Sequence, residues 1–143
     1  MKSWKDVQGE VQRVKPDIEM AASILKMMEI RKEATELLDK EKFASLKVES
    51  YYEIIKEGIT ALMAIDGYKT LSHEVLISYL NEFHRRDFLE SDTIFLDQLR
   101  QLRNKIVYKG FFVQIDYLDR NEVRIKTMVK KLIHILQIKL KSK

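Results

Sequence analysis

The chain has 143 residues, of which 45% are hydrophobic and 34% are charged, and its formal net charge is +4 at pH 7. This length and composition are typical of one folded domain and exclude an intrinsically disordered chain. The absence of cysteine excludes disulfides, thiol catalysis and cysteine-ligated metal centres, and four glycines with one proline are too few for the turns of a β-rich protein.

The first part of the chain predicts two long helices. Pro16 suits the first turn of a helix, and apolar residues recur at helical spacing over residues 17–38, where a polar run follows. A second helix is expected over residues 43–66, with apolar residues on more than one face, and Gly67 is expected to end it. Residues 1–15 are expected to form an N-terminal arm or an extension of the first helix.

A short helix and a long one are predicted next. The short helix covers residues 71–83, with Thr70 or Ser72 as its N-cap. The longer helix is expected to start near residues 91–92 and to end at Gly110.

The start of the last helix carries two recognisable sequence signals. Residues 111–115 are expected to be a hydrophobic linker that lies on the helices, with a short extended run as the alternative. Asp119 and Glu122 have the spacing of a capping box, and Leu118 with Val123 has the spacing of a hydrophobic staple. The expected core face of this helix comprises Ile125, Met128 or Val129, Leu132, Leu136 and Leu140.

Together these elements predict one all-α domain over residues 1–143. Short loops make neighbouring helices antiparallel, so the expected architecture is an antiparallel up-down four-helix bundle with an additional short helix. No stretch approaches the roughly 18 consecutive apolar residues of a membrane span, and the first residues lead into a polar stretch rather than a secretory signal. A cytoplasmic protein with no membrane partner is therefore expected.

The sequence predicts no metal site and no cofactor. His73, His84 and His134 fall on three different elements, and none has a second ligand spaced to share its helix face. Capping or surface roles are expected for these histidines. The glycines are not clustered, which excludes a P-loop and a dinucleotide-binding fingerprint.

One cluster of polar residues near the end of the fourth helix is suited to phosphate binding. Arg100 and Arg103 are one helical turn apart, and Asn104 and Tyr108 share a face at i,i+4. An arginine fork with neutral hydrogen-bonding groups beside it can bind a phosphodiester, and Lys105 adds a further cation. The alternative is that the arginines only solvate the outer face while Tyr108 seals the end of the bundle.

At these residues the chain resembles the HEPN domain, a helical family associated with prokaryotic nucleotidyltransferases. Arg103 and Tyr108 have the spacing of the family's Arg-x4-His motif. Residues 49–52 and 61–64 are similar to the family's tyrosine-plus-alanine/leucine helix. Residues 67–73 are similar to its glycine-containing turn before a Ser-His helix start.

The resemblance implies a four-helix bundle that dimerises and brings two copies of the motif into one cleft. In active members of the family, the motif His and Arg act on an RNA phosphodiester without a metal, and many members are toxins paired with a nucleotidyltransferase antitoxin. In this chain Tyr108 replaces the motif His. A tyrosine hydroxyl, with an ordinary pKa of about 10, is a poor general base at neutral pH, whereas imidazole is a good one.

Three functions therefore remain open. The first is a HEPN-like homodimer that binds a nucleotidyltransferase partner, RNA or a nucleotide through a patch of five residues: Arg100, Arg103, Asn104, Lys105 and Tyr108. The second is a metal-independent endoribonuclease toxin with Arg103 and Tyr108 as catalytic residues and Glu53 or Glu57 as an acidic partner. The third is a non-catalytic helical protein-interaction module. Phe111 and Phe112 are expected to be exposed and to offer a surface for association.

Overall fold

A computed structural model of the chain describes residues 2–143, and this part is mostly helical, which confirms the all-α prediction. Its helices are η1, a short 3-10 helix (Trp4–Glu10), and α1 (Ile18–Leu37), α2 (Ala44–Asp66), α3 (His73–Phe83), α4 (Glu90–Lys109) and α5 (Ile115–Lys141). Two short strands, β1 (Gln12–Arg13) and β2 (Tyr68–Lys69), pair antiparallel. None of the helices within residues 2–143 combines the length and the apolar character that a membrane crossing requires.

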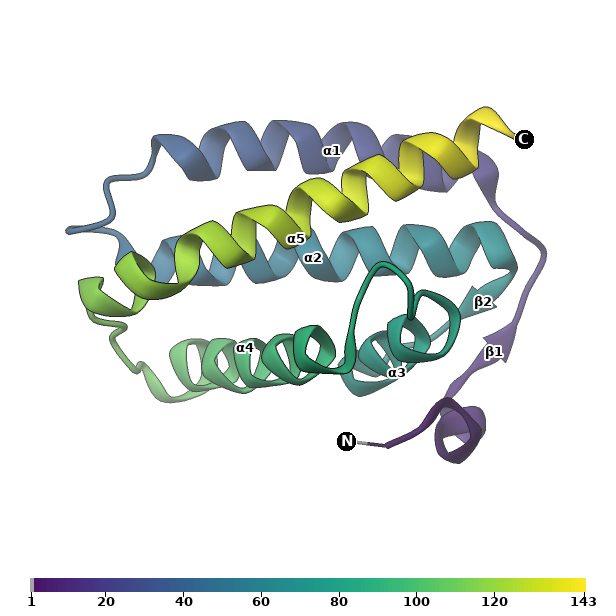
Figure 1. Cartoon of the computed structure of the whole chain (residues 1–143), viewed down its shortest axis with the longest axis horizontal. Helices are drawn as coiled ribbons and strands as arrows, with labels where there is room; N and C mark the ends of the chain where they lie inside the picture. The colour runs from purple at the N-terminus through teal and green to yellow at the C-terminus, as the bar shows by residue number, and fades with distance from the viewer. Residues whose placement is uncertain (1) are drawn as a thin grey trace.

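The helices are arranged around α2. Along the chain the four long helices alternate in direction, so that α1 and α4 run one way and α2 and α5 run the other (Figure 1). Helix α2 packs against each of α1, α3, α4 and α5, and α1 also packs against α5. Helices α2 and α5, which run in the same sense, are therefore direct neighbours.

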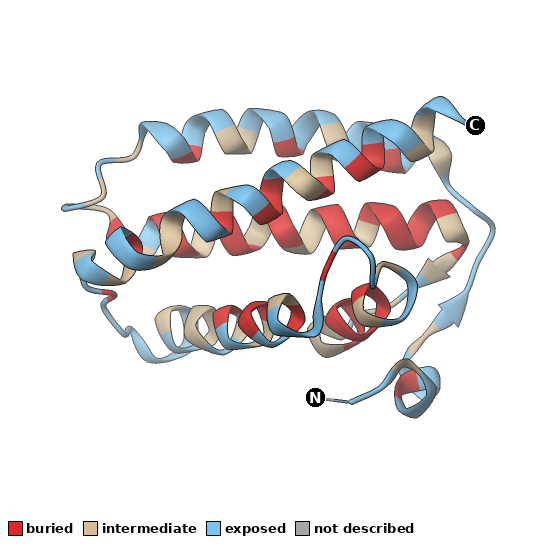
Figure 2. Ribbon diagram, viewed as in Figure 1, coloured by how far each residue is buried: buried red, intermediate tan, exposed pale blue. Residues whose placement is uncertain are grey.

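The composition of α2 explains its central place. Buried residues occur along almost its whole length and on more than one side (Figure 2), in agreement with the two-sided burial predicted from its sequence. Gly58 faces side chains of both α1 and α5. A Cβ atom at this position would lie 2.7 Å from Met28 Cε and 3.3 Å from Leu132 Cδ1, so a larger side chain would force these neighbouring side chains to move.

Helix ends at glycine agree with the sequence prediction. Gly67 follows α2 with φ of 85°, and Gly110 follows α4 with φ of 62°, both in the left-handed region that favours glycine. Helix α1 is confirmed within one residue at each end. Pro16 precedes the helix rather than lying in its first turn, and the Asp17 carboxylate caps it by accepting from the Met20 amide at 3.0 Å.

Residues 2–15 form a separate arm and not an extension of α1. Strand β1 pairs with β2, so the arm is held to the turn that follows α2. The Trp4 ring on η1 makes edge-to-face contacts with Tyr68, Tyr79 and Phe83, at centroid distances of 5.2, 5.9 and 5.3 Å. The Thr70 hydroxyl donates to the Glu10 carbonyl at 2.8 Å, which ties the arm to the segment just before α3.

The predicted start of the last helix is wrong. Helix α5 begins at Ile115, so Asp119 and Glu122 lie inside it and form no capping box. Val123 is 79% exposed and forms no staple with Leu118, which is buried. The two acidic residues instead bind side chains of other segments. Asp119 pairs with Lys40 at 2.6 Å.

Glu122 takes part in a buried polar cluster between α2 and α5. Its Oε2 atom accepts from the Tyr51 hydroxyl at 2.7 Å and lies 3.1 Å from the ammonium nitrogen of Lys47. The Lys47 side chain is only 7% exposed, so Glu122 is the group that compensates its charge. The apolar residues predicted to form the core face of α5 are buried, except that Leu140 is only partly buried.

Two other helix starts differ from their predicted positions by one to two residues. Helix α3 begins at His73, after Ser72, whose hydroxyl makes no capping bond; the Thr70 hydroxyl instead accepts from the Ser72 amide at 3.1 Å. Helix α4 begins at Glu90, and the Asp92 carboxylate accepts from the Leu89 amide at 3.1 Å. Residues 111–114 form a linker without regular structure, and its Val113 is buried, as predicted for a segment lying on the helices.

Candidate phosphate-binding site

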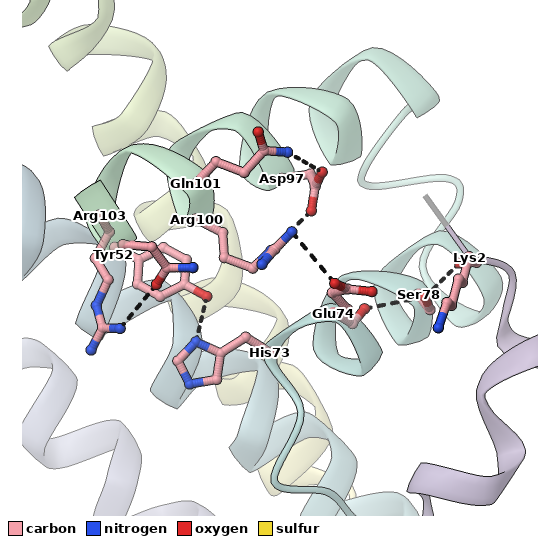
Figure 3. A network of polar contacts seen from close by, with 10 residues as sticks. Lys2, Tyr52, His73, Glu74, Ser78, Asp97, Arg100, Gln101 and Arg103 are labelled. Atoms are coloured by element: carbon pink, nitrogen blue, oxygen red, sulfur yellow. Dashed lines mark hydrogen bonds and ion pairs between the residues drawn. The ribbon is translucent and has the colours of Figure 1, made fainter. Parts of the chain in front are cut away.

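A small open hollow lies where the first turn of α3 faces the last turns of α4. Its volume is about 260 Å³. Four of the five residues predicted for the patch line it together with the start of α3: Arg100, Arg103, Asn104 and Tyr108, with Ser72, His73 and Glu74. Several of these residues and the contacts among them are visible in Figure 3.

Arg103 is the cation of this hollow that has no acidic partner. Its Nη1 atom donates to the neighbouring Asn104 Oδ1 at 3.3 Å, and its Nε is buried without a hydrogen-bond partner. The guanidinium carbon lies 5.8 Å from the centre of the Tyr52 ring and 5.9 Å from that of Tyr108. Among the ion pairs formed within residues 2–143, none includes Arg103. Its charge is therefore available to an anion.

Arg100 differs because acidic side chains compensate it. Its Nε donates to Asp97 Oδ1 at 3.0 Å, and its Nη2 lies 3.8 Å from Glu74 Oε1, so it bridges α4 and α3 (Figure 3). The side chain is 16% exposed. Arg100 thus fixes the position of the α3 start relative to α4, and contributes less free positive charge than Arg103.

His73 joins the cluster, a placement that the sequence does not predict. It is the first residue of α3, and its Nδ1 shares a 3.0 Å hydrogen bond with the hydroxyl of Tyr52 on α2 (Figure 3). Its Nε2 has no hydrogen-bond partner among the described residues. The expectation of a capping or surface role does not describe this environment, because the ring is half-buried and lines the same hollow as Arg103.

The surroundings keep both members of this hydrogen-bonded pair neutral. Burial lowers the pKa of His73, and the charges of Lys56 and Arg103 lower it further, against the opposing effect of Glu53. Burial raises the pKa of Tyr52 to about 12, and the nearby arginines only partly oppose this shift. At neutral pH the site therefore holds an uncharged imidazole bonded to an uncharged phenol.

Three of the residues predicted for the site do not line the hollow. Lys105 is exposed and outside it. Glu53 pairs with Lys56 at 2.8 Å on its own helix, and Glu57 pairs with Arg31 of α1 at 3.3 Å. Burial raises the pKa of the Glu57 carboxyl, but the ion pair directs that group to α1 and not to the hollow.

Tyr108 does not seal the end of the helices. Its ring is 74% exposed, at the rim of the hollow beside the Arg103 guanidinium. An exposed aromatic face next to a free cation is suited to stacking against a planar group.

No cluster of three metal-binding side chains occurs anywhere in residues 2–143. Outside the hollow, His84 contacts the Tyr79 hydroxyl at 3.4 Å and His134 is exposed on α5, so the three histidines lie on separate parts of the fold. The side chains that line the hollow carry guanidinium, imidazole, amide, phenol, hydroxyl and carboxylate groups.

Comparisons with family models, with curated proteins and with solved structures find no match to this chain.

Proposed function

We propose that this chain is a HEPN-like protein of the cytoplasm, an antiparallel four-helix bundle with an additional short helix, that binds single-stranded RNA at the hollow between α3 and α4. The observation that carries the proposal is the Arg103 guanidinium, which lines the hollow and has no carboxylate partner in the described chain. An unpaired cation beside neutral hydrogen-bonding groups favours an anionic ligand.

The side chains around Arg103 favour a nucleic-acid strand over a simple anion. The guanidinium can hold the non-bridging oxygens of a phosphodiester through two parallel hydrogen bonds. The Asn104 amide adds a neutral hydrogen-bonding group, and the exposed Tyr108 ring offers a face on which an unpaired base can stack. A phosphate-binding group beside a stacking surface is the combination that a flexible single strand requires.

RNA binding is expected to depend on Arg103. In Arg103→Ala the phosphate loses its main cation while the helices keep their packing, so the affinity for a labelled single-stranded RNA should fall by a factor of about 10 to 100. Fluorescence anisotropy measures the effect. The matched control is Arg85→Ala, which removes an arginine that is 71% exposed and lies outside the hollow. Equal affinity of the wild type and Arg103→Ala, or absence of binding by the wild type, would contradict the proposal.

We also propose that the protein is a homodimer, with a nucleotidyltransferase as a further partner in a toxin–antitoxin-like context. Support for self-association comes from an open hollow of about 730 Å³ beside the end of α4. Its lining includes the exposed side chains of Leu46, Val107, Phe111 and Phe112, and Phe112 is 77% exposed. Apolar groups of this size on one surface are typical of an association site.

Replacement of Phe112 should weaken the dimer. In Phe112→Ser an exposed aromatic ring is lost without any change to the core, so the dimer dissociation constant should rise by a factor of about 10 or more. Sedimentation equilibrium measures this. The control is Leu71→Ser, which removes another highly exposed apolar side chain away from this surface. A wild type that stays monomeric at every concentration would rule the dimer out.

A further inference from the structure

We infer that a second hollow, where the N-terminal arm meets the end of α2, binds a small carboxylate with an apolar tail. Its volume is about 370 Å³, at the lower end of the range for small-molecule sites. The tail lies on Met63, Ala64 and Leu76, while Lys15 and Lys69 supply positive charge for the carboxylate. This hollow shares no lining residue with the one between α3 and α4, so the site does not depend on the RNA binding proposed above.

The walls of this hollow come from segments that are distant in sequence. The linker before α1 and the first turn of α1 form one side, and the last two turns of α2 form another. Strand β2, the residue after it and the first turn of α3 complete the lining. In Figure 1 this region is found where β1 and β2 lie beside the end of α2. Side chains of different character therefore meet in one concave surface.

Backbone contacts shape the hollow without any ligand. On either side of Pro16, the Val14 amide donates to the Gly67 carbonyl at 2.9 Å and the Asp17 amide to the Ala64 carbonyl at 3.0 Å. A Cβ atom on Gly67 would lie 2.8 Å from the Val14 carbonyl oxygen, so the two segments approach as closely as a glycine permits. Because the walls are already joined, a ligand loses little free energy in ordering them.

The floor of the hollow is apolar. Met63, Ala64 and Leu76 are 1%, 3% and 4% exposed, so the hollow reaches down to the core of the protein. Met20 and Val14 are 42% and 38% exposed and add apolar surface nearer to the solvent. Methionine side chains are flexible and adapt to the shape of an apolar group. This part of the hollow is therefore suited to a short hydrocarbon chain.

The charged groups of the hollow favour an anion. Lys15, Lys69 and Arg13 take part in no ion pair within residues 2–143. The two lysines are exposed lining residues, and the Arg13 guanidinium lies 4.6 Å from the centre of the Tyr68 ring, which also lines the hollow. The acidic residue of the lining is Asp17, whose Oδ1 accepts from an amide in the first turn of α1 at 3.0 Å. The positive end of that helix partly compensates its charge, and the lysines remain available to a carboxylate.

The test uses three probes that separate the tail from the charge. Octanoate has both, 1-octanol has the same tail without the charge, and acetate has the charge without the tail. Each is titrated into the ¹⁵N-labelled protein, and amide chemical shifts are followed by NMR. We expect octanoate to shift the amides of residues 14–20, 60–64 and 68–70 and to bind about 10-fold more tightly than octanol. Acetate should cause no shifts at the same concentrations.

Variants then locate the two parts of the site. In the double variant Lys15→Gln, Lys69→Gln, the affinity for octanoate should fall by a factor of about 10 while that for octanol stays the same. The matched control is Lys26→Gln, Lys109→Gln, which removes two exposed lysines outside the hollow and should bind octanoate as the wild type does. Thr60→Trp places a large ring in the wall and should weaken the binding of both probes. The amide spectrum of each variant shows whether it is folded.

Several results would overturn the inference. These are no binding of octanoate by the wild type, equal affinities for octanoate and octanol, and equal octanoate affinities of the wild type and the folded Lys15→Gln, Lys69→Gln variant. Shifts centred on residues 106–114 would overturn it as well, because they would place the probe in the larger hollow beside the end of α4. A preference for octanoate that disappears with the two lysines supports the assigned ligand class.

Discussion

Glu122→Ala is expected to lower the free energy of unfolding by about 3 kcal/mol or more, because it leaves the buried Lys47 ammonium without its carboxylate. The same change removes the acceptor of the Tyr51 hydroxyl, whose oxygen lies 2.7 Å from Glu122 Oε2. The Lys47 side chain is only 7% exposed, so little water is available to solvate its ammonium in place of the carboxylate. Urea unfolding followed by circular dichroism measures the loss.

A second acidic residue on the same helix provides the matched control. Asp119 pairs with Lys40 at 2.6 Å, but the two side chains are 51% and 43% exposed. Exposed pairs contribute little, so Asp119→Ala should cost no more than about 1 kcal/mol. If both variants lost the same small amount of stability, the cluster around Glu122 would not be a major stabilising element of the fold.

The ionisation of Glu122 should also make stability depend on pH. Burial alone would raise the pKa of Glu122, but the hydrogen bonds from Tyr51 and Lys47 outweigh it, and the net effect lowers the pKa below its usual value. A carboxyl whose folded pKa is depressed stabilises the fold above its unfolded pKa of about 4.3, and that contribution is lost as the pH falls through the folded value. As the pH falls below about 5, the free energy of unfolding of the wild type should therefore decrease more steeply than that of Glu122→Gln.

Gly58→Leu is expected to destabilise the fold by about 3 kcal/mol through overpacking. A Cβ at this position already lies 2.7 Å from Met28 Cε and 3.3 Å from Leu132 Cδ1, so the additional leucine atoms have no room between α1, α2 and α5. The gain in helix propensity from replacing glycine, about 1 kcal/mol, only partly offsets this. Thermal and urea unfolding measure the difference.

Two comparisons identify the cause of that loss. Gly9→Leu adds the same side chain where no atom lies within 4 Å of the new Cβ, so stability should change by less than about 1 kcal/mol. Met28→Ala combined with Gly58→Leu removes the nearest obstacle and should recover part of the stability. No recovery in the double variant would show that the methionine is not the group in the way.

Helix positions follow from local sequence, and most of them could be predicted for that reason. The ends of α2 and α4 at Gly67 and Gly110 depend on one backbone conformation that glycine adopts easily. The start of α5 could not be read in the same way. Asp119 and Glu122 have the spacing of a cap, yet their carboxylates bind Lys40 and side chains of α2, partners that are distant in sequence.

The candidate site is predictable only where its residues share a helix. The pair of Arg103 and Asn104, with Tyr108 one turn further on, is visible in the sequence because i,i+4 residues share a face. His73 joins them only because α3 packs against α4, and the bond from Tyr52 depends on α2. Glu57 looked equally suitable as a partner, but its pairing with Arg31 is set by the packing of α1. Contacts between helices decide both outcomes.

The strand pairing at the N-terminal arm has a consequence for local opening of the native protein. The Val14 amide donates to the Gly67 carbonyl at 2.9 Å and the Asp17 amide to Ala64, so the chain before α1 covers the end of α2. These few bonds lie at the edge of the fold, whereas the amides in the middle of α2 are enclosed by α1 and α5. The amides of Val14 and Asp17 should therefore exchange with solvent before those in the middle of α2.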